Sequence, residues 1–135
     1  MNSSLTASQK RLHQAIRDMG CILPGAHEFG ANGWQMHHIY GSKAKHNKVN
    51  IGEYAVLLLP WELHDVHSNH ELNVTHHKNA FEEHYGMQKE LCVWQYDKLF
   101  VNYVFATIGR GAPPKFSTDD MPSEEVLMAI MDYHK

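Results

Sequence analysis

Two histidine-containing segments hold the residue types that could do chemistry in this chain. His37 and His38 are adjacent, and His64 and His67 are three residues apart with Asp65 between them. Imidazole nitrogens bind divalent metals, and an imidazole with a reference pKa of about 6.5 can take up a proton near neutral pH. The pattern therefore predicts a metal site with a base beside it.

These residues suit the hydrolysis of a phosphodiester bond. That reaction requires a water made nucleophilic, a cation on the phosphoryl oxygens and help for the departing 3′ oxygen. On a helix, His64 and His67 would share one face and could reach a common ion. We predict His37, His64 and His67 as metal ligands and His38 as the general base. Asp65 is predicted to support catalysis as a carboxylate that orients a ligating ring.

Lys43, Lys45 and Lys48 follow the histidine pair directly. Three lysines in a polar segment are most often a solvated loop, and that is the alternative interpretation here. The segment also lies where the phosphate backbone of a nucleic acid would run past His38. We therefore predict these three lysines as DNA contacts.

The chain contains 12 histidines, so exposure without function is the competing explanation for each of them. The adjacent pair and its spacing from His64 favour a functional role for His37, His38 and His64. The surface interpretation is favoured for the later ones, which are His70, His76, His77 and His84.

Local patterns predict the elements that must position these side chains. Thr6 and Gln9 form the pattern of a capping box before a helix at residues 7–19. Apolar alternation predicts a strand at 34–39, and an apolar run before Pro60 predicts a second, buried strand at 55–59. A loop is predicted at 40–52, and helices at 61–68, 76–85, 87–104 and 122–133. Alternation along the first strand points His37 and His38 to opposite faces, unless the strand frays into the loop.

Composition limits the class of protein. A chain of 135 residues with 43% hydrophobic residues is expected to form one domain, with a core at 20–86 and a C-terminal helical extension at 87–135. The net charge of -3 means that any attraction to nucleic acid must be local. Two cysteines exclude a disulfide framework and a four-cysteine zinc site, and no segment approaches the roughly 20 apolar residues of a membrane span. We expect a cytoplasmic protein without membrane association.

Several short motifs are shared with a known group of enzymes. They are Met19-Gly20-Cys21, His37-His38-Ile39-Tyr40-Gly41, Leu57-Leu58-Leu59-Pro60, Glu62-Leu63-His64-Asp65-Val66-His67 and Phe81-Glu82-Glu83-His84-Tyr85-Gly86. With these motifs the chain resembles the HNH-type nucleases of bacteriophage and prophage, in particular the recombination-enhancement (Ref-like, RecA-dependent) nuclease group. The resemblance covers roughly residues 8–100. The histidine pair is also similar to that of the nuclease colicins.

The resemblance implies a fold and an activity. The fold would be α+β, with a small ββα-metal (HNH-like) core, a two-stranded hairpin and flanking helices. The activity would be that of a metal-dependent DNA endonuclease acting in phage DNA recombination or processing, in the host bacterial cytoplasm. The working ion would be Mg²⁺ or Mn²⁺, although a site rich in imidazole would also bind Zn²⁺ or Ni²⁺. DNA and a RecA-type recombinase filament would be the partners.

The chain departs from the pattern of that group in several places. Pro60 and Leu63 stand where such proteins often carry cysteine or histidine, and Cys21 has no CxxC partner, so a structural zinc is not expected. The middle Asn or Asp of the motif has two candidates, Asn50 and Glu53. The competing functions are a catalytically silent relative that binds DNA or a protein, and a histidine-rich metal-binding structural protein.

Overall fold

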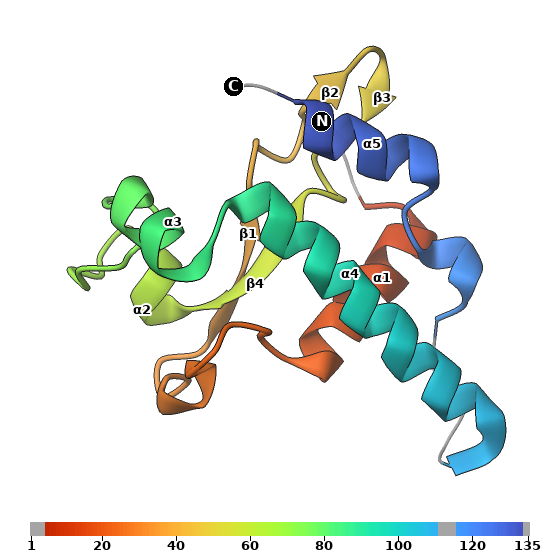
Figure 1. Cartoon of the computed structure of the whole chain (residues 1–135), viewed down its shortest axis with the longest axis horizontal. Helices are drawn as coiled ribbons and strands as arrows, with labels where there is room; N and C mark the ends of the chain where they lie inside the picture. The colour runs from red at the N-terminus through yellow and green to blue at the C-terminus, as the bar shows by residue number, and fades with distance from the viewer. Residues whose placement is uncertain (1–4, 111–115, 134–135) are drawn as a thin grey trace.

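The computed structural model describes residues 5–110 and 116–133 of the chain. The fold is α+β, as the sequence predicts, with two small antiparallel sheets among the helices (Figure 1). The elements in chain order are α1 (Ala7–Met19), η1 (Ala26–Glu28), β1 (Trp34–His38), β2 (Lys45–His46), β3 (Val49–Asn50), β4 (Val56–Pro60), α2 (Trp61–His64), α3 (Lys78–Tyr85), α4 (Gln88–Phe105), η2 (Ala106–Arg110), η3 (Thr118–Asp120) and α5 (Glu124–Asp132).

The antiparallel pair of β1 and β4 lies at the centre of the fold, with His37 opposite Leu57 and His38 opposite Val56. Every residue of β4 is buried, as the apolar run predicts. Because side chains alternate along a strand, Val56 and Leu58 pack into one apolar cluster with α1, α4 and α5. Leu57 and its neighbours on the other face pack into a second cluster with α2 and α3. The two-stranded ribbon is therefore covered on both faces.

A glutamine from α4 pairs with the backbone of β4. Gln95 is fully buried; its amide nitrogen donates to the Val56 carbonyl oxygen at 2.9 Å, and its amide oxygen accepts from the Leu58 backbone nitrogen at 3.1 Å. Buried backbone groups need such partners, which a further strand would otherwise supply. The side chain thus ties α4 to the sheet.

Helix α1 begins and ends at the predicted residues. The Gln9 backbone nitrogen donates to Thr6 Oγ1, and the Thr6 backbone nitrogen donates to Gln9 Oε1, both at 3.0 Å. This is the reciprocal capping box that the sequence predicts. Leu12 and Ile16 on the buried face join the core with β4 and α4.

The predicted helix at 61–68 begins at Trp61 as expected, but its predicted end is wrong, because α2 ends at His64. Asp65 is extended, with ψ of 140°. The carbonyl oxygens of Glu62 and Asp65 both accept from Nδ2 of the buried Asn73, at 3.1 and 2.9 Å, rather than from the next turn of a helix. His64 and His67 therefore do not share a helix face.

The predicted loop at 40–52 contains a small hairpin, in which β2 pairs with β3. Asn47 and Lys48 form its turn, and both have positive φ, 51° and 68°. Two positive φ values in a row are what a type I′ turn requires. Asparagine tolerates this conformation, but lysine is not typical of it, so the residues at this turn do not indicate a hairpin.

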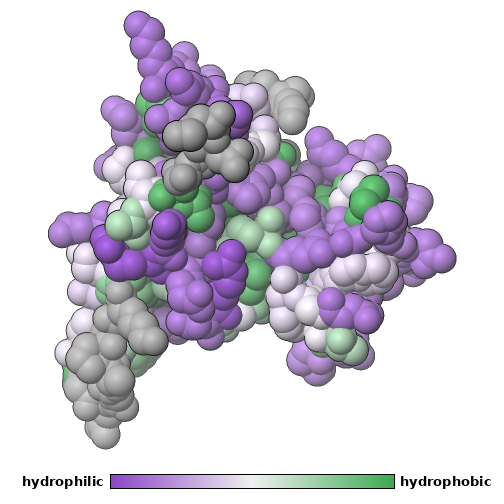
Figure 2. All heavy atoms as spheres, turned by 180° about the vertical axis from the view of Figure 1, so that it is seen from behind, coloured by the Kyte–Doolittle hydropathy of each residue, from purple (hydrophilic) through white to green (hydrophobic). Residues whose placement is uncertain are grey.

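The surface seen from behind is largely hydrophilic, with small separated apolar patches (Figure 2). Across the described ranges, the helices lack the length and apolar character needed to cross a bilayer.

Candidate active site

The fold brings His37 and His64 together. Their ring centroids lie 4.8 Å apart, and the ring planes are inclined by 59°. His37 lies on the face of β1 that is shared with Leu57, and His64 is the last residue of α2. The short helix after β4 thus returns the chain to this face of the sheet and places the two imidazoles side by side.

Each of these rings is oriented by an amide oxygen. His37 Nε2 lies 2.6 Å from Gln88 Oε1, and His64 Nδ1 lies 2.6 Å from Gln35 Oε1. An amide oxygen can only accept, so these two ring nitrogens carry the protons and donate them. Nδ1 of His37 and Nε2 of His64 therefore keep their lone pairs, which is the state in which an imidazole binds a metal.

Each amide is in turn oriented by a carboxylate. Gln88 Nε2 donates to Glu82 Oε2 at 2.9 Å, and Gln35 Nε2 donates to Asp65 Oδ2 at 2.8 Å. Asp65 thus reaches His64 through Gln35 rather than directly. The hydrogen bond from Gln35 is the main cause that lowers the pKa of Asp65, so its carboxyl group is ionised at neutral pH.

Burial keeps both imidazoles neutral. It lowers the pKa of His37 to about 4 and also lowers the pKa of His64. Neutral rings do not require a proton to leave before a metal binds at pH 7. The electrostatics of the pair therefore favour metal binding.

His38 points to the opposite face of β1 and contacts a carboxylate. Its Nε2 lies 2.7 Å from Glu53 Oε1, and the side chains are 29% and 18% exposed. A carboxylate can only accept, so Nε2 carries a proton and Nδ1 is left as the proton acceptor. Of the two candidates for the middle residue of the motif, Glu53 contacts His38, whereas Asn50 lies in β3 opposite Lys45.

The turn that carries Glu53 is closely packed. The Ala55 backbone nitrogen donates to the Ile51 carbonyl oxygen at 2.7 Å. A Cβ added at Gly52 would lie 2.1 Å from the Ser42 carbonyl oxygen, so only glycine fits before Glu53. This packing fixes the backbone from which the carboxylate reaches His38.

His13 supports the same turn from α1. It is buried, and its Nε2 lies 2.7 Å from the Glu53 carbonyl oxygen and 3.8 Å from Glu53 Oε1. Its ring centroid is 6.2 Å from that of His38. Burial lowers the pKa of His13, so a neutral ring donates to the carbonyl.

The sequence model of a family described as recombination enhancement, RecA-dependent nuclease, matches residues 5–100. The chain belongs to this family. The predicted membership of the recombination-enhancement, RecA-dependent nuclease group is thereby confirmed, and the matched segment contains every residue of the site described above. Neither a curated protein nor a solved structure matches the chain.

The remaining predicted residues of this RecA-dependent nuclease family member lie on the surface. The His67 ring is exposed and makes no hydrogen bond or ring contact with the residues that the structure describes; its backbone nitrogen donates to Asp65 Oδ1 at 2.8 Å. Lys43 and Lys45 are exposed and line a cavity of about 350 Å³ together with Glu53. The segment of Lys43, Lys45 and Lys48, called the lysine hairpin below, is therefore adjacent to the carboxylate that contacts His38.

Reasoning from sequence missed four residues of this site, which are Gln35, Gln88, Glu82 and His13. Gln35 shares a strand face with His37, and that alternation is the one signal that could have indicated it. Gln88 is 51 residues from His37 in the chain, and His13 lies in α1, so no local pattern connects either of them to the pair. Gln88 also falls in the segment that the sequence assigns to the C-terminal extension.

Within residues 5–110 and 116–133, no group of three or more His, Cys, Asp or Glu side chains is arranged to bind a metal. His37 Nδ1 and His64 Nε2 supply two imidazole donors, a set that suits a divalent transition metal with water in its other positions. The donor chemistry of this pair therefore fits such an ion.

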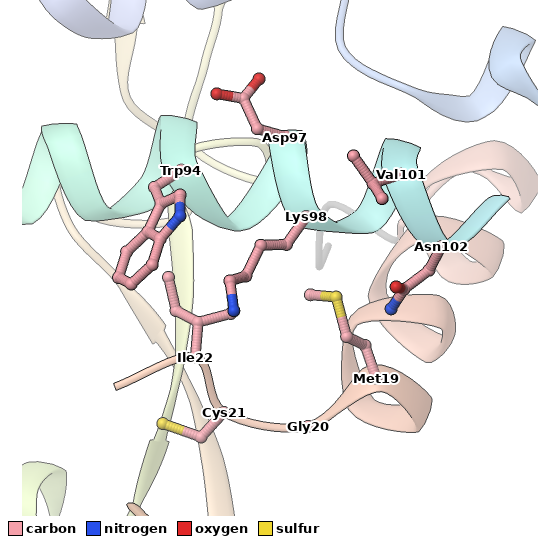
Figure 3. Close-up of a pocket in the computed structure, with 9 residues that line it drawn as sticks. All are labelled: Met19, Gly20, Cys21, Ile22, Trp94, Asp97, Lys98, Val101 and Asn102. Carbon is pink, nitrogen blue, oxygen red and sulfur yellow. The ribbon is translucent and has the colours of Figure 1, made fainter. Parts of the chain in front are cut away.

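Cys21, part of one motif shared with this family, lines a different cleft. That cleft, of about 510 Å³, lies between the end of α1 and α4, and Trp94 and Lys98 reach into it from α4 while Asp97 points away (Figure 3). None of the described residues that line it is a histidine. Burial raises the pKa of the Cys21 thiol, so at neutral pH it is protonated.

Proposed function

We propose that the chain is a metal-dependent DNA endonuclease of the HNH type, with a ββα-metal core made of β1, β4 and α2. One observation supports it above all: two neutral imidazoles with free lone pairs lie together on one face of β1, and the adjacent residue His38, on the other face, has its Nε2 hydrogen-bonded to Glu53. This is the division into ligands and base that phosphodiester hydrolysis requires.

His37 Nδ1 and His64 Nε2 are the proposed protein ligands of the ion. When bound, a divalent ion supplies positive charge to the phosphoryl oxygens and to the departing 3′ oxygen. Two imidazoles favour Mn²⁺, Zn²⁺ or Ni²⁺, whereas Mg²⁺ prefers oxygen ligands and keeps several waters. We propose Mn²⁺ or Mg²⁺ as the working ion, and His67 as a further ligand only if the segment after α2 moves toward the pair.

His38 is the proposed general base. Its Nδ1 takes a proton from water while the water oxygen attacks phosphorus, the bond from phosphorus to the 3′ oxygen breaks, and that oxygen leaves to be protonated. The products are a 3′ hydroxyl and a 5′ phosphate. Glu53 keeps the ring oriented and stabilises the imidazolium ion that forms, because its carboxylate oxygen lies 2.7 Å from Nε2.

The family assignment supports the biological part of the proposal. Its description names a nuclease, recombination and dependence on RecA, so we propose DNA as the substrate and a RecA-type filament as the partner in phage DNA recombination or processing. Lys43, Lys45 and Lys48 are the proposed DNA contacts. All three are exposed, and two line the cavity that reaches Glu53.

The test is cleavage of supercoiled plasmid DNA, with and without a RecA filament, across Mn²⁺, Mg²⁺, Zn²⁺ and Ni²⁺. Cleavage should stop in excess chelator, and His38→Ala should reduce its rate by about 10²- to 10⁴-fold while circular dichroism stays unchanged. His27→Ala is the matched control, because His27 is exposed and outside the site. Full activity in His38→Ala would refute the assignment of the base. DNA binding without cleavage under every condition would favour the silent relative.

A further inference from the structure

A cavity of about 460 Å³ opens beside His37. Besides this ring it is lined by residues that follow β1, by the starts of α3 and α4, and by Tyr133 just after α5. Its volume is in the range of ligand sites in proteins, roughly 300–1,000 Å³. It is thus the described cavity that shares a residue with the histidine pair.

One wall of this cavity is aromatic and well supported. The rings of Tyr40 and Tyr133 lie 4.3 Å apart between centroids, inclined by 39°. Tyr40 Oη donates to the Ile130 carbonyl oxygen at 3.1 Å. Lys89 Nζ donates to the carbonyl oxygens of Met131 and Tyr133 at 2.9 and 3.3 Å. These hydrogen bonds hold the end of α5 in place, so the two tyrosine rings are positioned in the absence of a ligand.

The cavity also offers a lysine that forms no ion pair among the described residues. Lys78, the first residue of α3, is exposed and forms no hydrogen bond or ion pair within the described part of the chain. Glu82 is the carboxylate among the lining residues, and its Oε2 accepts from Gln88 rather than from a lysine. An anion entering here would therefore meet the ammonium group of Lys78 with no ion pair to break.

An aromatic wall next to a free cation matches the two parts of a nucleotide. Bases stack on aromatic side chains, and phosphates are bound by lysine. A base paired inside a duplex has both faces covered by its neighbours, so it cannot turn a face to a wall set in a cavity. The occupant must have an exposed base face.

We propose that this cavity binds one unpaired nucleotide of the DNA strand, adjacent to the bond that is cut. The base lies against Tyr133 and the exposed Met87, and its phosphate contacts Lys78. This inference rests on the proposed function, because His37 belongs both to the cavity and to the metal pair. It adds a substrate subsite apart from the lysine hairpin.

The test compares two single-stranded oligonucleotides of equal charge: a fully abasic strand, and the same strand with one thymidine at its centre. Their affinities for the full chain are measured by fluorescence anisotropy in chelator, so that no cleavage occurs. One base should raise the affinity about 10-fold, within the range known for stacking on an aromatic ring. Tyr133→Leu should remove this gain without changing the affinity for the abasic strand, and Tyr133→Phe should restore it.

Lys78→Ala supplies an independent readout. It should leave the gain from the base intact but reduce the slope of log affinity against log salt by about 0.7, the value for one phosphate contact on a single strand. Lys10→Ala is the matched control, since Lys10 is exposed on α1 and does not line the cavity. A gain that is absent in the wild type, or that survives in Tyr133→Leu, overturns the proposal. Plasmid cleavage separates the two proposals. If the single base raises the affinity but no plasmid is cleaved, only the proposed endonuclease activity is contradicted. If plasmid is cleaved but the base does not raise the affinity, only the proposed subsite is contradicted.

Discussion

Acid should destabilise the metal-free protein through His37. Burial lowers the pKa of this ring to about 4, against a value of about 6.5 for an unfolded histidine. Between these two values the unfolded chain binds a proton that the folded chain excludes. The contribution of the neutral His37 ring to the free energy of unfolding is therefore fully present above pH 6.5. Below that pH it falls at about 1.4 kcal/mol per pH unit, so about 3 kcal/mol is lost near pH 4.

Urea unfolding in chelator, at pH 7 and pH 4.5, measures this loss. His37→Gln has no titrating ring, so the free energy of unfolding of the wild type should fall by about 2–3 kcal/mol more than that of the variant. His27→Gln, at an exposed site, should follow the wild type at both pH values. If the free energy of unfolding falls by the same amount in the wild type and in His37→Gln between the two pH values, the conclusion that the buried His37 ring is neutral is wrong.

Three further changes probe other parts of the molecule. Gln35→Leu removes the amide that orients His64, so Mn²⁺ or Zn²⁺ affinity should fall about 10- to 100-fold by calorimetry; unchanged affinity would refute the role of that amide. Asp120→Asn breaks the pair with Arg11, which holds the pKa of Asp120 well below its usual range. Its melting temperature should be lower than that of the wild type above about pH 4, with a difference that shrinks as pH falls further and Asp120 becomes protonated; a constant difference would contradict this. Burial raises the pKa of Cys92 to about 12, so iodoacetamide at pH 8 should modify this cysteine only in denaturant. Labelling of Cys92 in the native protein, located by mass spectrometry, would contradict its burial.

Elements specified by neighbouring residues could be predicted from the sequence. Thr6 and Gln9 satisfy each other's backbone at the start of α1, and both residues are visible in the sequence. The apolar run of β4 required burial on both faces, and the structure provides it. In such cases the interacting groups lie within one turn or one strand, so local sequence contains the information.

Features specified by distant residues could not be predicted. Asn73 ends α2 by bonding carbonyl oxygens eight and eleven positions before it, and this separates His67 from His64. Gln88 orients His37 from the start of α4, 51 residues away. Polar side chains of this kind have no periodicity, and only the folded chain shows which backbone or ring they meet.

The register of β1 against β4 also limits how such a chain can vary in length. Because side chains alternate, inserting or deleting one residue before His37 would exchange the faces of the whole strand, turning His37 toward Glu53 and His38 toward His64. Natural variants of this nuclease should therefore keep residues 34–38 constant in length and vary at exposed positions such as Asn69 and Glu71, after α2. The exposed position Asn69 is also where an engineer could insert a DNA-targeting module without exchanging the faces of His37 and His38.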